Sequence, residues 1–148
     1  VKAIIVEAYK PVKKQLSRTP AALTEGLSKI ARHIQMGDQY VALVGDQIVG
    51  TMRVRLSGQM GVISRLGILE RFRGRRIGTL LMQYAENLLA SRGAQVVEVE
   101  VYGAVEAQLS FYEALGYKET GRKKRLKEVI VTMVKSLVEE EAIEEEDL

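Results

Sequence analysis

The sequence contains no cysteine and no tryptophan, and only one histidine, His33. Without cysteine, the chain forms no disulfide and has neither a thiolate metal site nor a cysteine nucleophile. A single histidine argues against a histidine-rich metal centre and against a serine–histidine–aspartate triad, so we expect no metal. The absence of cysteine is compatible with a reducing compartment, and we expect a cytoplasmic protein.

Long apolar runs are absent as well. No stretch of the sequence reaches the roughly 18–20 apolar residues that span a bilayer. No charged and then apolar leader with a small-residue cleavage site opens the chain, so we expect no membrane partner. The length of 148 residues and the hydrophobic content of 47% suit one compact domain with a single core.

Acidic residues are sparse except at the C-terminal end. Residues 139–147 contain seven acids, whereas all 22 Lys and Arg precede them. The first 138 residues therefore hold 22 basic and 12 acidic residues, a net charge of +10. A basic body suits an anionic ligand, such as a phosphorylated cofactor, a nucleic acid or a membrane surface. We divide the chain into a folded domain, 1–138, and an acidic tail, 139–148. The acidic side chains of the tail repel one another, which favours disorder over a short helix.

The hydrophobic pattern predicts strands that alternate with helices. The expected strands are residues 2–8, 40–44, 47–56, 61–69, 95–102, 117–122 and 127–137. Helices are expected over residues 19–36, 75–92 and 104–115, each followed directly by a glycine. This order predicts an α/β (α+β) single-domain fold, with a central mixed sheet of about six to seven strands flanked by helices.

A basic loop leads into the helix expected at residues 75–92. A helix start exposes unpaired backbone N–H groups and the positive end of the helix dipole, and both favour a bound phosphate. Gly74 and Gly78 have no side chain, so a ligand can approach the main chain closely. Four arginines surround this helix start: Arg71, Arg73, Arg75 and Arg76. A positive charge at a helix start interacts unfavourably with the helix dipole, by up to about 1 kcal/mol for each exposed arginine. A bound anion would compensate this unfavourable interaction.

The segment Arg73-Gly74-Arg75-Arg76-Ile77-Gly78 resembles the acetyl-CoA signature of the GNAT superfamily of N-acetyltransferases, Arg/Gln-x-x-Gly/Ala-x-Gly/Ala. Arg73 and Gly78 match the ends of that signature, whereas Arg76 stands where the family usually has Gly or Ala. The preceding Leu66-Gly67-Ile68 is similar to the family's Leu-Ala-Val strand end, whose main chain pairs with the pantetheine arm. The resemblance therefore implies an acetyl-CoA site formed by Leu66, Gly67, Ile68, Arg73, Gly74, Arg75, Arg76, Ile77, Gly78 and Thr79.

The segment Phe111-Tyr112-Glu113-Ala114-Leu115-Gly116-Tyr117 resembles a second family motif, Phe-Tyr-x-x-x-Gly-Phe/Tyr. In many members the tyrosine that matches Tyr112 protonates the departing CoA thiolate, and a phenol with a pKa of about 10 suits that role. On spacing alone the sequence favours Tyr112 as a core aromatic, because Leu109 and Leu115 share its helix face. The resemblance to the family favours the catalytic role instead. The family often has an asparagine seven residues earlier, where this chain has Val105.

The resemblance covers about residues 39–134 and implies an acetyl-CoA-dependent N-acetyltransferase in which a primary amine attacks the thioester directly. Many members carry a catalytic glutamate on the strand that matches residues 61–69, but this strand has no carboxylate. The sequence names no base; the remaining carboxylates are Glu98, Glu100 and Glu106, each also explained as a solvated surface residue.

A missing strand carboxylate favours an acceptor amine of low pKa, such as a peptide N-terminus. At pH 7, deprotonating a lysine-type amine costs about 4.6 kcal/mol, whereas an α-amine of pKa ~7.8 costs only about 1.1 kcal/mol. A small metabolite amine, a polyamine and an aminoglycoside remain open as acceptors.

Two other functions also stay open. The first is a non-catalytic acyl-CoA-binding regulatory module, which the departures at Arg76 and Val105 favour and Tyr112 disfavours. The second is a basic nucleic-acid-binding domain, suggested by Lys123-Lys124-Arg125 but disfavoured because the aromatics form no stacking stripe. The last expected strand, 127–137, is rich in Val and Ile, and such strands pair across dimers in several relatives, so a homodimer is plausible.

Overall fold

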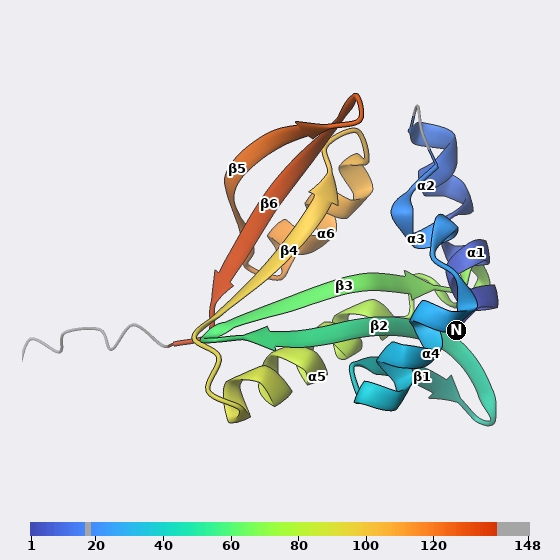
Figure 1. Cartoon of the computed structure of the whole chain (residues 1–148), viewed down its shortest axis with the longest axis horizontal. Helices are drawn as coiled ribbons and strands as arrows, with labels where there is room; N and C mark the ends of the chain where they lie inside the picture. The colour runs from blue at the N-terminus through green and yellow to red at the C-terminus, as the bar shows by residue number, and fades with distance from the viewer. Residues whose placement is uncertain (17–18, 139–148) are drawn as a thin grey trace, which may run out of the picture.

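The computed structural model describes residues 1–16 and 19–138, and these form one mixed sheet of six strands flanked by helices (Figure 1). The strands are β1 (Gln39–Val44), β2 (Gln47–Ser57), β3 (Met60–Ile68), β4 (Val96–Tyr102), β5 (Lys118–Arg125) and β6 (Glu128–Ser136). Their order in the sheet is β1-β2-β3-β4-β6-β5, and only β3 and β4 pair in parallel. The predicted fold class is confirmed; the acidic tail, 139–148, lies outside the described residues.

Among the described residues, four α-helices precede the sheet and two lie between its strands. They are α1 (Lys2–Ala8), α2 (Lys10–Gln15), α3 (Ala21–Thr24), α4 (Leu27–Met36), α5 (Ile77–Ser91) and α6 (Glu106–Ala114), with a 3₁₀ turn, η1 (Glu70–Phe72), before α5. In Figure 1, α5 runs along β2 and β3, and α6 lies against β4. The N-terminal helices lie beside the start of β2 and the end of β3.

The expected first strand, residues 2–8, is wrong, because this segment is the helix α1. Ile5, Ala8 and Val12 are buried together, at the spacing of one helical face rather than of alternate strand positions. The helix expected over 19–36 is instead two helices, α3 and α4, separated by Glu25 and Gly26 in extended conformations.

Two apolar clusters hold these layers together. The larger lies between the sheet and α5 and includes Met52, Ile63, Met82 and Leu89, all essentially buried. The smaller joins the N-terminal helices to the start of α6 and consists of Ile5, Ala8, Tyr9, Val12, Ala22 and Val105. Burying a large apolar side chain contributes roughly 1.5–3 kcal/mol. The second cluster therefore fixes α1 beside the end of β3, where the expected cofactor residues lie.

The sheet opens between its two parallel strands. β3 pairs with β4 only through Met60, Gly61 and Val62, and beyond this point the two strands diverge (Figure 1). A bulge follows in β3, because the β2 pairing shifts between Ser64 and Gly67. Arg65, within the bulge, has the left-handed φ of 55°, which costs a non-glycine residue roughly 1–2 kcal/mol. A bulge re-aims side chains, and this one lies at the opening in the sheet.

Candidate functional site

The larger of two cavities, about 520 Å³, lies among α1, α2, the end of β3, the start of α5 and α6. Of the expected cofactor residues it is lined by Leu66, Gly67, Ile68, Arg73, Gly74, Arg76, Ile77, Gly78 and Thr79. Arg75 does not line it. Sequence segments on either side of the basic loop thus meet around one cavity.

The start of α5 forms one wall of this cavity. The helix begins at Ile77, two residues later than expected, because Arg76 adopts the left-handed conformation with φ 62°. Glycine is the usual residue in this conformation, which explains why the family signature has a small residue here. Among the described residues no side chain caps α5, so the N–H groups of Ile77, Gly78 and Thr79 are left for another acceptor. The N–H groups at this helix start therefore suit a phosphate.

Two glycines let the surrounding elements approach the cavity closely. A Cβ atom on Gly78 would lie 3.3 Å from Cζ of Phe111 in α6, and one on Gly67 would lie 3.0 Å from Cβ of Ala8 in α1. A larger residue at either position would therefore require the neighbouring side chain to shift by a few tenths of an ångström. Gly78 was expected to lack a side chain so that a ligand can approach the main chain, and the structure adds a packing reason at Gly78 and at Gly67.

The four arginines of the basic loop do not converge on one point. Arg73 donates hydrogen bonds to the carbonyl oxygens of Ile68, at 3.2 Å, and Ala8, at 2.8 Å. The guanidinium groups of Arg71 and Arg75 lie 5.2 Å and 5.1 Å from the centre of the Phe72 ring. Arg73 therefore joins the loop to α1, and only Arg73 and Arg76 reach the cavity.

Tyr112 reaches the cavity from α6. Its ring packs edge-on against Phe111, at 5.0 Å, and Tyr117, at 5.6 Å between centroids. Burial, with a smaller contribution from Tyr9, raises the pKa of the Tyr112 phenol above its ordinary value. Burial likewise raises the pKa of Tyr9 to about 12. Both phenols keep their protons at neutral pH and can donate hydrogen bonds into the site.

A smaller cavity, about 150 Å³, lies at the opening in the sheet, where residues of both β3 and β4 line it. Four residues line both cavities: Tyr9, Leu66, Gln108 and Tyr112. Of the three candidate carboxylates only Glu100 lines the smaller cavity, and its Oε2 lies 2.9 Å from Nζ of Lys123. The two cavities thus meet at Tyr112, with a carboxylate on one side of it.

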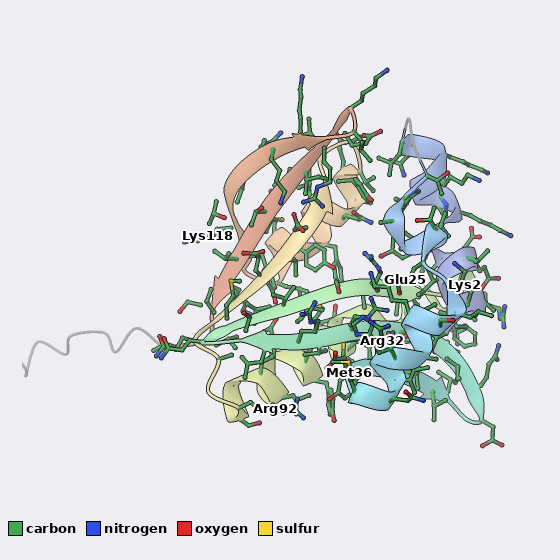
Figure 2. The ribbon with its side chains drawn as sticks, in the orientation of Figure 1. Lys2, Glu25, Arg32, Met36, Arg92 and Lys118 are labelled. Carbon is green, nitrogen blue, oxygen red and sulfur yellow. The ribbon has the colours of Figure 1, made fainter. Side chains whose placement is uncertain are left out.

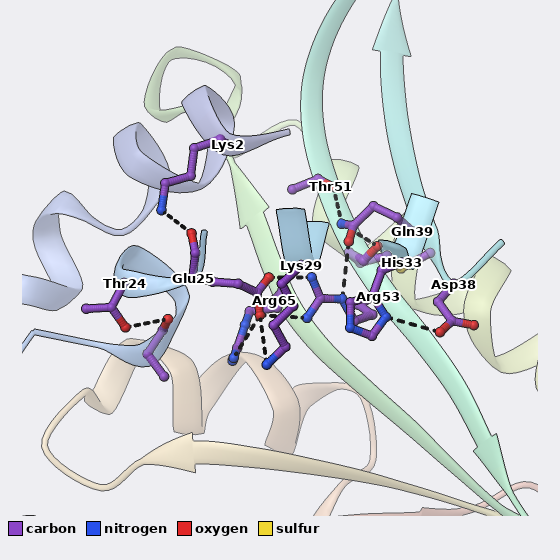
Figure 3. A network of polar contacts seen from close by, with 12 residues as sticks. Lys2, Thr24, Glu25, Lys29, His33, Asp38, Gln39, Thr51, Arg53 and Arg65 are labelled. Carbon is purple, nitrogen blue, oxygen red and sulfur yellow. Dashed lines mark hydrogen bonds and ion pairs between the residues drawn. The ribbon is translucent and has the colours of Figure 1, made fainter. Parts of the chain in front are cut away.

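Glu25 lies behind the wall of the smaller cavity, between the N-terminal helices and the sheet (Figure 2). Its carboxylate accepts two hydrogen bonds from Arg53 and lies 3.5 Å from both Nζ of Lys29 and Nη2 of Arg65 (Figure 3). The hydrogen bonds from Arg53, followed by the nearby cations, lower the pKa of Glu25 to about 2. Lys2 donates to the main-chain oxygen of Glu25 at 2.7 Å. This network fixes the break between α3 and α4 against β2 and β3.

Sequence reasoning missed Tyr9, Arg65 and Arg125 as lining residues, whereas Ser64, considered for orienting a water, does line the smaller cavity. None belongs to a motif, and Tyr9 directly follows the segment expected as a strand. Arg125 belongs to the basic run Lys123-Lys124-Arg125, which ends β5 beside the turn into β6. β6 itself lies between β4 and β5, so the strand considered for dimer pairing has no open edge. The homodimer stays a prediction.

Within residues 1–16 and 19–138, no group of three or more His, Asp or Glu side chains is arranged to hold a metal ion. Over the same residues, no helix combines the length and the apolar character required to cross a bilayer.

Comparisons with known proteins identify the family of this chain. The model of the acetyltransferase (GNAT) family matches residues 9–117. Over 83 residues the chain is 34% identical to N-alpha-acetyltransferase 30 of Schizosaccharomyces pombe, covering 53% of this chain and 55% of that protein. The chain thus spans about half the length of this curated relative.

Two solved structures share the fold over nearly the full chain. Ard1 from Thermoplasma volcanium has a TM-score of 0.72 at 20% identity, covering 94% of this chain and 95% of that one. An aminoglycoside 6'-N-acetyltransferase complexed with coenzyme A has a TM-score of 0.69 at 16% identity, covering 93% and 91%.

Proposed function

Because the chain belongs to the acetyltransferase (GNAT) family, we propose that it transfers an acetyl group from acetyl-CoA to a primary amine. The observation that carries this proposal is the meeting of two cavities at Tyr112, through the opening between β3 and β4. Acetyl-CoA enters from the larger cavity and the acceptor amine from the smaller one. We assign this activity to residues 1–138, as one acetyltransferase domain.

The larger cavity fits the parts of acetyl-CoA. The uncapped N–H groups of Ile77, Gly78 and Thr79 suit the pyrophosphate, and Arg76 adds a positive charge beside them. The main chain of Gly67 and Ile68, next to the bulge, suits the amide groups of the pantetheine arm. Phe111 and Val105 provide apolar surface for its methylene groups. The cavity is therefore polar at the start of α5 and apolar toward Tyr112.

The reaction requires two protons to leave the acceptor ammonium. Glu100, on the wall of the smaller cavity, takes the first, directly or through water, and the neutral nitrogen attacks the thioester carbonyl carbon. A C–N bond forms and the C–S bond breaks. The departing sulfur receives a proton from the hydroxyl of Tyr112, and the second ammonium proton, lost from nitrogen as the amide forms, returns through water to the Tyr112 phenolate.

The acceptor that we propose is the α-amine of a peptide N-terminus. The relative from S. pombe is named as an N-alpha-acetyltransferase, and Ard1 from T. volcanium shares the fold. An α-amine also loses its proton at pH 7 for about 1.1 kcal/mol, so a weak base such as Glu100 suffices.

The test measures acetylation of two matched peptides, one with a free N-terminus and no lysine, the other with a blocked N-terminus and one lysine. We expect kcat/KM to be at least about tenfold higher for the free N-terminus. Faster acetylation of the lysine side chain would contradict the proposed acceptor. Binding of acetyl-CoA with no turnover of any amine would instead indicate a non-catalytic acyl-CoA-binding module.

A further inference from the structure

The wall of the smaller cavity carries more positive than negative charge. Its charged lining residues are Arg65, Arg125 and Glu100. Next to Arg65, the carboxylate of Glu25 lies among three cationic side chains, Lys29, Arg53 and Arg65 (Figure 3). Arg53 holds both of its oxygens, which leaves Arg65 at 3.5 Å from one of them. The Nε atom of Arg65 is buried and, among the described residues, has no hydrogen-bond partner. The described protein groups therefore do not fill all the hydrogen-bond donors of Arg65.

Arg65 is also held in an unfavourable backbone conformation. It lies in the β3 bulge with φ 55°, in the left-handed region that favours glycine. About one quarter of its side chain, 24%, remains exposed, and the residue lines the smaller cavity. A bulge and a left-handed arginine at the cavity wall are the kind of strain that proteins keep at functional sites.

A second arginine reaches the same cavity from a distant part of the chain. Arg125, at the end of β5, lines the cavity with Arg65, whereas its neighbour Lys124 does not. The only acidic residue on this lining is Glu100, whose carboxylate already lies 2.9 Å from Lys123. The lining therefore has one carboxylate, Glu100, which an ammonium group would share with Lys123, and two guanidinium groups for an anion.

We propose that the smaller cavity selects amine acceptors that carry a carboxylate close to the amine, which Arg65 and Arg125 bind while Glu100 receives the ammonium. Planar guanidinium groups match carboxylate oxygens in geometry and charge. This inference rests on the proposed acetyl transfer and names the acceptor class of that site. The carboxylate has two sources: the side chain of an acidic residue near a peptide N-terminus, or the α-carboxylate of a free amino acid.

Two matched pairs of acceptors separate these sources. The first pair is a peptide that begins Ala-Glu and the same peptide beginning Ala-Gln. The second pair is free alanine and alaninamide. Steady-state acetylation is measured for all four with the intact chain, and acetyl-CoA binding is measured in parallel by calorimetry.

We expect kcat/KM to be at least tenfold higher for the acidic member of one pair, and the pair that shows it identifies the source. In the variants Arg125→Gln and Arg65→Gln that ratio falls to about one third or less of its original value. Lys124→Gln, which removes a charge from the adjacent position outside the cavity, leaves the ratio unchanged. Arg125 lies at the end of an exposed strand, so its variant remains informative even if Arg65→Gln does not fold.

Equal rates for the acidic and amide members of both pairs would overturn the inference while leaving acetyl transfer intact. A ratio that survives both arginine substitutions would overturn the assignment of these residues. Acetyl-CoA binding without turnover of any of the four acceptors would also overturn the inference. Failure to bind acetyl-CoA would instead refute the proposed function on which it rests.

Discussion

Among single side chains, Tyr112 gives the most direct test of the proposed reaction. Burial raises the pKa of its phenol, so the group stays protonated throughout the working pH range. We predict that Tyr112→Phe lowers kcat at least about 100-fold, the usual size of a lost proton donor, with acetyl-CoA affinity nearly unchanged. Steady-state kinetics and calorimetry measure the two quantities separately.

Tyr117→Phe is the matched control for this substitution. The Tyr117 hydroxyl donates to Oε2 of the buried Glu86 at 2.9 Å and does not line either cavity. We expect removal of the Tyr117 hydroxyl to lower the unfolding free energy by roughly 1–2 kcal/mol and to leave kcat within a few-fold of the original value. Similar losses of kcat in the two variants would mean that Tyr112 acts through packing rather than as a proton donor.

Glu25 gives a prediction about stability and pH. Its folded pKa of about 2 lies below the ordinary value of 4.5, so its stabilisation is present above about pH 5 and is lost as pH falls toward 2. The shift corresponds to about 3 kcal/mol of unfolding free energy. We predict that Glu25→Gln destabilises the domain by at least this amount at pH 7. Between pH 5 and pH 2, the unfolding free energy of this variant falls less than that of the original protein.

Glu119→Gln is the control for Glu25, because Glu119 forms an ion pair with Arg122 on the exposed strand β5. Chemical denaturation at pH 7 and pH 3 compares the three proteins. An unchanged pH dependence in Glu25→Gln would contradict the account of this network.

The residues of the two motifs could be predicted because they are contiguous in sequence. Of the cofactor and catalytic residues named in advance, all except Arg75 line one cavity, including Leu66, Thr79 and Tyr112. Arg65 and Glu25 could not be predicted, because their positions depend on a bulge and on pairing between segments about 30–40 residues apart. Arg73 was expected to face a phosphate, and its hydrogen bonds to two carbonyl oxygens were not foreseeable from sequence.

Between secondary-structure elements, the contact of α1 with the basic loop depends on Arg73. Its hydrogen bonds to the oxygens of Ala8 and Ile68 join the end of α1 to the segment before α5. We predict that Arg73→Ala costs roughly 1 kcal/mol, since the side chain is partly exposed. The substitution should also speed amide hydrogen exchange in α1 more than in α5.

Arg75→Ala provides the comparison for Arg73→Ala. Arg75 is an arginine of the same loop that packs over Phe72 and does not reach α1. Equal exchange rates in α1 for the two variants would show that Arg73 does not hold this helix in place.

The N-terminal helices show why element prediction fails where apolar runs are short. A run such as Ala3-Ile4-Ile5-Val6 suits a strand or a buried helix equally well, and only packing against β2 and β3 decides between them. The later strands and helices were predicted to within a few residues, because glycines end the helices and turns separate the strands. The break between α3 and α4 follows from the long-range pairing of Glu25 with Arg53, which no local pattern contains.

For the molecule as a unit, function depends on how the two halves of the sheet separate. β3 and β4 pair over three residues and then diverge, and the two cavities share four lining residues near this opening. The N-terminal helices and α6 close the larger cavity from both sides. The two motif segments supply much of the lining of the larger cavity, whereas the smaller cavity is lined mostly by segments without a motif.

The most direct test of the central claim is a calorimetric titration of acetyl-CoA into the protein and two variants. Gly78→Asp places a carboxylate at the cavity wall, and Leu80→Asp places the same charge on the same turn of α5 at an exposed position. An acid near a helix start does not oppose the dipole, so we expect the α5 start to remain intact in both. The account predicts micromolar binding by the original protein and by Leu80→Asp, and binding at least tenfold weaker by Gly78→Asp. Equal affinity in all three proteins, or no binding by the original protein, would contradict the placement of acetyl-CoA in the larger cavity.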